Sequence, residues 1–268
     1  KSFSSYIFSN FDTIISFATG IAFFRIEGGY GIQPRWSDVT RKGTMRSYVS
    51  RVMEPEEFQD MSRDDLAALI RRELWVDEAN VSGKFIHPKN AEFLERAMYV
   101  CPWCGLSTFE SHADVIHCTK CGRQIRHLPT KELEGIGFDF PHRFVADWYE
   151  WQQNYINHTD LTALTETPVY RETVRLSRVH PYKYKELLKK EATVCLYGDR
   201  ITVDDREFPF DSVGAVVVLG KNKVNIYDGN EILQLKGHKR FNALKYVNFF
   251  HRYKNRKAGE NNGQFLGL

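Results

Sequence analysis

Four cysteines in two pairs are the residues of this chain whose types and spacing are best suited to chemistry. Cys101–Gly105 reads CPWCG and Cys118–Gly122 reads CTKCG, with thirteen residues between the two pairs. Two residues between paired cysteines allow one tight turn to direct both sulfurs at one ion, and Zn²⁺ takes four thiolates in a tetrahedron. The glycine after each pair permits the positive φ that such a turn requires. The spacing therefore predicts a structural zinc ion in a zinc ribbon, held by Cys101, Cys104, Cys118 and Cys121.

The alternatives for these cysteines are a redox Cys-x-x-Cys or two disulfides, although a lone redox motif would not need a second copy at this distance. Four thiolates leave no open coordination position, so we expect the metal to hold the fold and not to perform chemistry. Cys195, in the apolar run 192–197, is predicted to be a buried free thiol. This cysteine usage fits a reducing cytosol.

Histidines supply two further candidate sites. His112, His117 and His127 flank the cysteine pairs, and they are predicted to be polar surface residues because four cysteines already fill a tetrahedron. His142 and Asp147 form a His-x4-Asp pattern, in which a histidine can act as general base on an acceptor hydroxyl. Pro141 is predicted to open a helix, where residues five apart face different directions, and no glycine-rich phosphate-binding block follows. We interpret this pair as a coincidence, and no catalytic residue is assigned.

Charge is unevenly distributed along the chain. The 268 residues carry a net charge of +3, with 42% hydrophobic and 26% charged residues, as is typical of a soluble globular protein. Residues 1–168 carry 18 Lys+Arg against 23 Asp+Glu, whereas residues 169–257 carry 19 against 10. A basic module on an acidic body predicts an anionic partner, either a phospholipid surface or nucleic acid. A solvated basic face with no partner is the alternative.

The most apolar window, residues 6–24, is not expected to span a membrane. It contains Asp12, and a central aspartate costs about 2.5–3.5 kcal/mol in a spanning helix. We therefore expect buried structure or contact with a membrane surface, with no signal peptide. Because the sequence begins with Lys1, we expect it to be cut at its N-terminus. The protein is predicted to be cytoplasmic and peripheral to the membrane.

Hydrophobic periodicity predicts an α+β fold. Residues 1–60 are typical of the last strands of a larger α/β domain, with a strand over 45–53. A helix is predicted to begin at Ser62, capped through Asp65, with an apolar stripe at Leu66, Leu69, Ile70 and Leu74. Further helices are predicted from Pro88 through Met98 and from Pro141 to about Ile156.

The pattern changes to β from about residue 169. Strands are predicted over 169–179, 184–188, 192–196, 200–203, 214–219, 223–227 and 232–235, followed by a helix over 240–252. This order is that of a pleckstrin-homology-like barrel. The predicted domains are the end of an acyltransferase-like domain (1–80), a helix with the zinc ribbon (81–128), a helical linker (129–165) and the pleckstrin-like module (166–268).

Several segments resemble the bacterial 1-acylglycerol-3-phosphate acyltransferase family. Residues 20–77 are similar to the closing portion of those lysophospholipid acyltransferases, on the motifs TGI at 19–21, IEGGYG at 26–31, QPRWSD at 33–38 and RKG at 41–43. The cysteine pairs, GFDFP at 137–141 and FNALKY at 241–246 resemble the C-terminal extension of a clostridial-type branch. Within these motifs, Arg35 and Trp36 could touch an anionic headgroup or form a packing loop.

The resemblance implies acyl transfer from acyl-CoA or acyl carrier protein to lysophosphatidic acid in phospholipid synthesis. The family's His-x4-Asp and Glu-Gly-Thr-Arg motifs belong before residue 20, and neither is present there. The family's proline, expected around 22–24, is also absent. We therefore expect this chain alone to be inactive. The alternative function is a non-enzymatic zinc-ribbon module that binds nucleic acid or another anionic partner.

Overall fold

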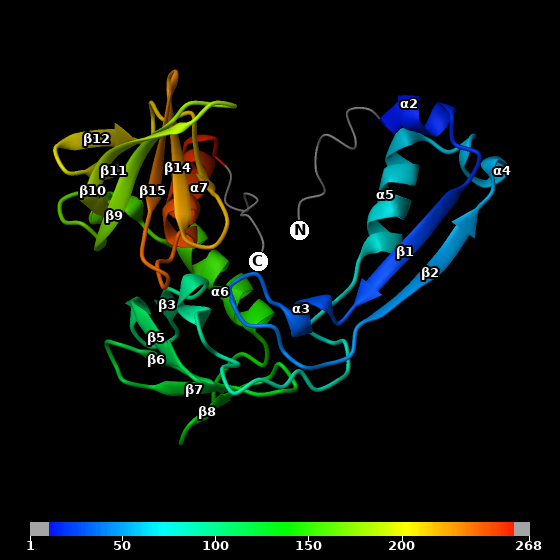
Figure 1. The fold of residues 1–268 in the computed structure, drawn as a ribbon, viewed down its shortest axis with the longest axis horizontal. Coiled ribbons are helices and arrows are strands. Elements are labelled where there is room, and N and C mark those ends of the chain that lie inside the picture. The colour runs from blue at the N-terminus through cyan, green and yellow to red at the C-terminus, as the bar shows by residue number, and fades with distance from the viewer. Residues whose placement is uncertain (1–10, 260–268) are drawn as a thin grey trace.

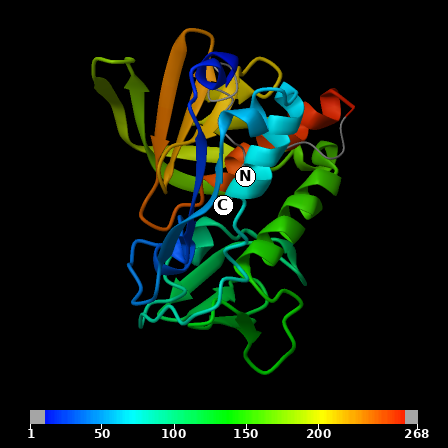
Figure 2. The same ribbon diagram turned by 90° about the vertical axis from the view of Figure 1, so that its right-hand side faces the viewer.

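The computed structural model describes residues 11–259 as a mixed α and β fold with three parts (Figures 1 and 2). An N-terminal β-hairpin with one long helix stands on one side, and a seven-stranded sheet with the C-terminal helix stands on the other. A two-stranded ribbon and a four-stranded sheet, which we call the small sheet, lie between them in the sequence and carry the paired cysteines. One helix, α6 (Val145–His158), leads from this small sheet to the seven-stranded sheet.

The N-terminal part contains two paired strands and a covering helix. After α2 (Phe11–Ser16) come β1 (Ile21–Glu27), α3 (Gly29–Ile32), β2 (Arg46–Met53), α4 (Pro55–Phe58) and α5 (Arg63–Leu74). β1 and β2 are antiparallel. The predicted strand over 45–53 and the predicted start of a helix at Ser62 are confirmed, since the Ser62 side chain accepts a hydrogen bond from the Asp65 N–H at 3.2 Å. Of the predicted stripe on α5, Leu66 and Leu69 are buried, whereas Leu74 is exposed.

The β1–β2 hairpin has two unlike faces. Phe23 and Met53 are buried against α5, in a cluster with Phe58, Leu66 and Leu69. The opposite face is apolar and exposed: Phe24 pairs with Val49 across the strands, and each side chain is 54% exposed. Within residues 11–259, α5 therefore covers one face of the hairpin, and the other face is exposed to solvent.

The middle part is built from short strands. They are β3 (Val100–Cys101), β4 (Gly105–Leu106), β5 (Phe109–His112), β6 (Val115–Cys118), β7 (Gln124–His127) and β8 (Leu133–Gly135). β3 pairs with β4, and β5 to β8 form a four-stranded antiparallel sheet.

The predicted helix from Pro88 through Met98 is wrong. Only one turn of 3₁₀ helix forms there, η1 (Leu94–Arg96). The Ala91 N–H donates to the Ala113 carbonyl at 2.9 Å, and the Phe93 N–H donates to Ser111 Oγ at 2.8 Å. Because these backbone groups bond to the β5–β6 hairpin, they cannot form the i to i−4 bonds of an α-helix.

Helix α6 begins at Val145, four residues later than the predicted start at Pro141, and a short 3₁₀ helix, η2 (Leu161–Leu164), follows it. Its Trp148 packs in the cluster that contains the cysteines, whereas its Ile156 packs in the core of the seven-stranded sheet. The helix predicted to be a linker therefore contributes to two hydrophobic cores.

The C-terminal part is a curled half-barrel of seven antiparallel strands. These are β9 (Tyr170–Val179), β10 (Lys185–Leu196), β11 (Arg200–Val203), β12 (Arg206–Pro209), β13 (Ala215–Val218), β14 (Lys223–Asp228) and β15 (Glu231–Lys236). Their order across the sheet is β12-β11-β10-β9-β15-β14-β13. The predicted strands over 184–188 and 192–196 are one strand, β10, whose register shifts between Lys189 and Ala192. The sequence did not predict β12.

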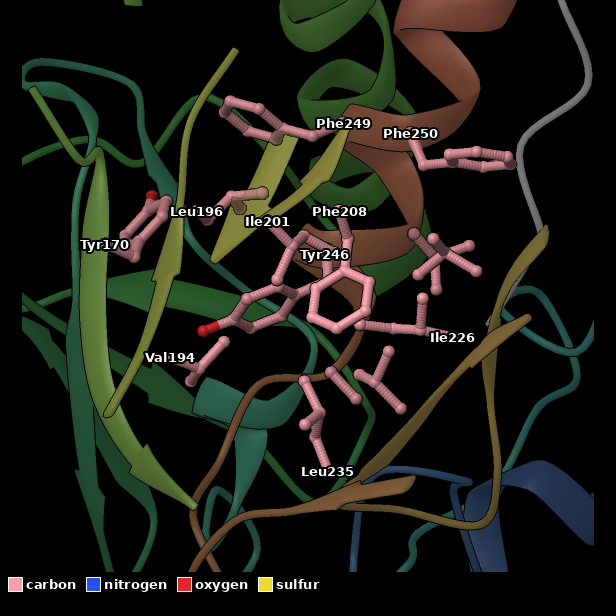
Figure 3. Packing of buried hydrophobic residues seen from close by; sticks show 14 of the residues in the cluster. Tyr170, Val194, Leu196, Ile201, Phe208, Ile226, Leu235, Tyr246, Phe249 and Phe250 are labelled. Carbon is pink, nitrogen blue, oxygen red and sulfur yellow. The ribbon is translucent and has the colours of Figure 1, made fainter. Parts of the chain in front are cut away.

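Helix α7 (Leu244–Lys257) packs against this half-barrel, and its buried side chains share one core with those of the strands. Tyr246 and Phe249 of α7 belong to one buried cluster with side chains from the strands such as Val194 and Ile226, all of them labelled in Figure 3. Cys195 lies in β10, 4% exposed and with a free thiol, as predicted. Among the helices within residues 11–259, none combines the length and the apolar character needed to cross a bilayer.

Candidate metal centre

The four paired cysteines come together at one point. Their Sγ atoms all lie within 4.8 Å of one another, and the Sγ atoms of Cys101 and Cys121 are 3.9 Å apart. Four sulfurs at tetrahedral corners, about 2.3 Å from one zinc ion, would lie about 3.8 Å from each other. Cys101 and Cys118 are buried, and Cys104 and Cys121 are half-buried. This cluster could hold one metal ion, and all five cysteines are free thiols, so none forms a disulfide.

Two glycines shape the turns that present these sulfurs. Gly105 has φ 67° and Gly122 has φ 71°, in the left-handed region where a side chain is strained. A Cβ on Gly105 would also lie 2.5 Å from the Tyr155 hydroxyl oxygen of α6. The sequence therefore needs glycine at position 105 for both its backbone conformation and its close contact.

The thiols of the cluster differ in how easily they ionise. Burial raises the pKa of Cys101 to about 12. Burial also opposes ionisation of Cys121, but the backbone N–H of Arg123 and neighbouring thiol hydrogen bonds outweigh it and lower this pKa to about 6. A bound cation favours the thiolate form of every ligand, so metal binding and deprotonation of Cys101 would be coupled.

Aromatic side chains pack against the first cysteine turn. Trp103, between the first two cysteines, packs edge-on against Phe138 with ring centroids 5.1 Å apart. The Arg123 guanidinium lies 4.6 Å from the Trp103 ring centroid, within the range of a cation–π contact. These contacts attach the first cysteine turn to the second, because Arg123 directly follows the second glycine.

The three flanking histidines do not join the cluster. His112 is exposed, and His117 Nε2 lies 3.7 Å from a Glu110 carboxylate oxygen at the surface. The prediction of a surface position is wrong for His127, which is 3% exposed. Its ring packs edge-on against the buried Trp36, with centroids 5.8 Å apart. For Trp36, the predicted packing loop is confirmed.

The structure gives His142 and Asp147 separate surroundings. The Asp147 carboxylate accepts a hydrogen bond from the Phe144 N–H at 2.8 Å, at the start of α6. The His142 ring lies between Phe140 and Trp151, with centroid distances of 5.5 and 5.3 Å. Burial lowers the pKa of His142, and the Asp147 charge opposes this shift. Asp147 therefore contributes to the helix start.

Ion pairs between the three parts were not visible in the sequence. Arg240, after β15, binds the carboxylates of Glu92 and Glu95 near η1. Arg96 Nη2 lies 2.8 Å from Asp38 Oδ2, and Lys221 Nζ lies 2.9 Å from Asp38 Oδ1. The partners are 58 to 183 residues apart, so no local sequence signal pairs them.

Comparisons with known proteins add no assignment to this geometry. No protein-family model matches the chain, and no curated protein or solved structure matches it either.

The burial of His127 predicts a pH-dependent stability. Burial, with the nearby Arg41 charge, lowers the pKa of His127 to about 3, whereas an unfolded histidine titrates near 6.5. Below pH 6.5 the unfolded chain gains a proton that the folded chain does not, so stability falls as the pH decreases. By pH 5.5 this histidine should remove about 1.4 kcal/mol relative to pH 7.5.

Urea unfolding at pH 7.5 and 5.5 measures this effect. His127→Gln should lose less stability over this interval than the wild type, and His112→Gln, at an exposed position, should behave as the wild type does. Other histidines remain in all three proteins and cancel in the comparison. An equal loss of stability in His127→Gln and the wild type would contradict the assignment.

Proposed function

We propose that Cys101, Cys104, Cys118 and Cys121 bind one structural Zn²⁺ as a zinc ribbon. The observation that carries this proposal is the convergence of four sulfurs within 4.8 Å from two turns of the same spacing. Four soft thiolates favour Zn²⁺ over harder cations that prefer oxygen. When bound, the ion supplies no open position for a substrate, so its contribution is to folding.

The proposed metal supports a part of the chain with little other regular structure. β3 and β4 have two residues each, and such a short pair is not stable by itself. Cys101 ends β3, and Val100 before it belongs to the core of the half-barrel. A metal at the cysteines would therefore fix both the β3–β4 pair and the segment that joins this pair to the half-barrel.

Metal analysis of the purified chain tests this proposal. We expect one zinc per chain, and we expect Cys118→Ser to lose it together with at least about 2 kcal/mol of unfolding free energy. Cys195→Ala changes the cysteine outside the cluster and should keep a full zinc content. A metal-free wild-type chain with unchanged stability would contradict the proposal.

We further propose, from the resemblance in residues 20–77, that the N-terminal part is the closing portion of an acyltransferase-like domain. Its open face supports this proposal. Phe24, Ile26, Val49 and Val52 expose about half of their side chains on the hairpin face that α5 leaves uncovered. An α/β layered domain covers both faces of its sheet, so an apolar face that α5 leaves uncovered supports the proposal that these strands belong to such a domain.

Acyl transfer to lysophosphatidic acid tests this second proposal. A protein expressed with the coding region upstream of Lys1 should form phosphatidic acid from lysophosphatidic acid and acyl-CoA. The 268-residue chain should not, because the resemblance carries no catalytic residue onto it. Turnover by the 268-residue chain, or none by the longer protein, would contradict the proposal.

We also propose that the C-terminal part is a pleckstrin-like module that binds anionic phospholipid at a membrane surface. The supporting feature is the turn between β9 and β10. Tyr182 is fully exposed, and Tyr184 is 60% exposed next to Lys183 and Lys185. Exposed tyrosines with adjacent lysines suit the interface between lipid headgroups and acyl chains, where an aromatic ring can insert and cations meet phosphate.

Many other basic residues of this part are neutralised locally. Arg178 pairs with Glu186 and Glu231, Lys189 with Asp204, and Lys257 with Asp211. These pairs reduce the charge available elsewhere on the half-barrel. The β9–β10 turn is therefore the region where we expect the basic segment to contact lipid.

Sedimentation with vesicles of phosphatidylcholine and phosphatidylserine tests the lipid proposal. Replacing Lys183 and Lys185 by Gln should weaken binding by about 2 kcal/mol, roughly thirtyfold. Replacing the exposed Lys84 and Lys89 by Gln gives the same change in charge outside this part and should have little effect. Vesicle binding that does not depend on the phosphatidylserine content would contradict the proposal. Salt-dependent binding to an oligonucleotide, without binding to vesicles, would favour the nucleic-acid alternative.

A further inference from the structure

A cavity of roughly 400 Å³ lies where the N-terminal part, the small sheet and α6 meet. Its lining includes Tyr30 and Arg41 before β2, the segment 75–79 after α5, His127 and Lys131 near β7, and the first residues of α6. Pockets for small molecules are of this size, and they occur where separate parts of a fold meet.

The cavity has an uncompensated buried charge. Arg41 is 3% exposed, and its guanidinium lies 5.0 Å from the Trp36 ring centroid. Its two terminal nitrogens donate to the carbonyls of Gly31 at 3.3 Å and Asn90 at 2.6 Å. Within residues 11–259 no carboxylate forms an ion pair with it, and its Nε is buried without a hydrogen-bond partner. Because a buried unpaired charge costs several kcal/mol, this position favours an anionic ligand.

Two further buried nitrogens on the lining also lack a partner. They are Nδ1 of His127, a residue that is 3% exposed, and Nε2 of Gln153 on α6. The Gln153 amide nitrogen can only donate, and the imidazole nitrogen donates in one of its tautomers. Three unpartnered nitrogens around one cavity suit a ligand that is rich in acceptor oxygens.

The start of α6 adds two backbone donors, although the carboxylate of Asp147 in the same turn opposes the positive end of the helix dipole. Val145 and Ala146 line the cavity and form the first turn of this 14-residue helix. Their N–H groups have no acceptor within the helix, and a helix N-terminus favours an anion. The Asp147 carboxylate satisfies the Phe144 N–H, the group immediately before this turn.

Lys131 adds a second buried cation. It is 6% exposed, and its ammonium donates to the carbonyls of Glu78 and, at 2.6 Å, Val81. Burial lowers its pKa, with Glu78 and Asp77 opposing the shift. Lys131 thus fixes the segment that forms one wall of the cavity and leaves a positive charge beside it.

The acidic residues of the lining are engaged or solvated. Both Glu78 carboxylate oxygens accept from the Gly28 N–H at 3.1 Å. Asp77 is exposed and accepts from the Ala79 N–H and the Asn80 amide, and Glu150 is exposed. The buried charges at the cavity are therefore positive, and the negative ones are nearer to solvent.

Aromatic side chains form much of the remaining wall, namely Tyr30, Trp75, Phe144 and Tyr149. We propose that this cavity binds a small anion, a carboxylate or phosphate monoester, carried on a flat apolar body. The anionic group meets Arg41 and the first turn of α6, and the body packs against the aromatic walls. This proposal does not depend on zinc binding or on acyl transfer.

Calorimetric titration of the full chain with phenyl phosphate and benzoate tests the proposal, with phenol and inorganic phosphate for comparison. Either aromatic anion should bind more tightly than phenol, which lacks the charge, and than inorganic phosphate, which lacks the ring. The tighter of the two identifies the preferred anionic group.

Two variants on α6 keep the fold and change the charge at the cavity. Ala146 is exposed, and an acidic residue suits the first turn of a helix, so Ala146→Asp should leave the helix stable. The added negative charge should weaken binding of the preferred anion at least about tenfold. Ala146→Asn is the matched neutral control and should change affinity less than about threefold. Glu150→Gln removes an exposed negative charge and should strengthen binding.

Failure of both aromatic anions to bind at millimolar concentration would overturn the proposal. If phenol bound as tightly as the aromatic anions, the anionic group would not be recognised. If inorganic phosphate bound as tightly, the apolar body would not be recognised, and either result would contradict the proposal as stated. Equal effects of Ala146→Asp and Ala146→Asn would show that charge at this position is irrelevant, which would also overturn it.

Discussion

A single buried amide holds the entry to the cysteine cluster. Gln152 of α6 is fully buried, and its Oε1 accepts from the N–H groups of Tyr99 at 2.7 Å and Val100 at 3.0 Å. Its Nε2 donates to the Ala97 carbonyl at 3.0 Å. Residues 97–100 lie outside any helix and pair with only one short strand, so these bonds replace those of regular structure. The position of Cys101, one residue later, depends on them.

The same segment receives support from the half-barrel. The Tyr170 hydroxyl of β9 donates to the Tyr99 carbonyl at 3.0 Å, and Asn248 of α7 donates to the Tyr99 hydroxyl at 2.6 Å. Tyr99 is buried in the core of the half-barrel, whereas Met98 before it packs with the cysteines. The small sheet and the half-barrel therefore share one continuous packed region, joined through side chains that are far apart in the sequence.

The sequence predicted the features that depend on neighbours along the chain. The cysteine pairs, the cap at Ser62 and the alternation of the β-strands each need only a few adjacent residues. The helix at 88–98 was predicted wrongly because its backbone bonds to Ser111 and Ala113, which periodicity cannot include. β12 was missed because its four residues, Arg206–Pro209, carry one buried apolar side chain between two charged residues and a proline.

The candidate site at Arg41 was equally hidden from the sequence. Arg41 stands in a polar segment that indicates a loop, and nothing near it predicts burial against Trp36 or a shared cavity with His127, 86 positions later. His127 is a polar residue next to Arg126, and its type does not indicate burial. It is buried because Trp36 of the N-terminal part packs against its ring. Residues that meet through tertiary contact alone are beyond the reach of spacing arguments.

The contact between Gly105 and Tyr155 has a consequence for how this sequence can vary. The phenol oxygen of Tyr155 occupies the space that a β-carbon at position 105 would need. A homologue without glycine at position 105 should therefore have a shorter side chain at position 155, and a residue such as asparagine at 105 that tolerates a left-handed backbone. Positions 105 and 155 should covary across related chains, although one lies in a metal-binding turn and the other on a helix fifty residues away.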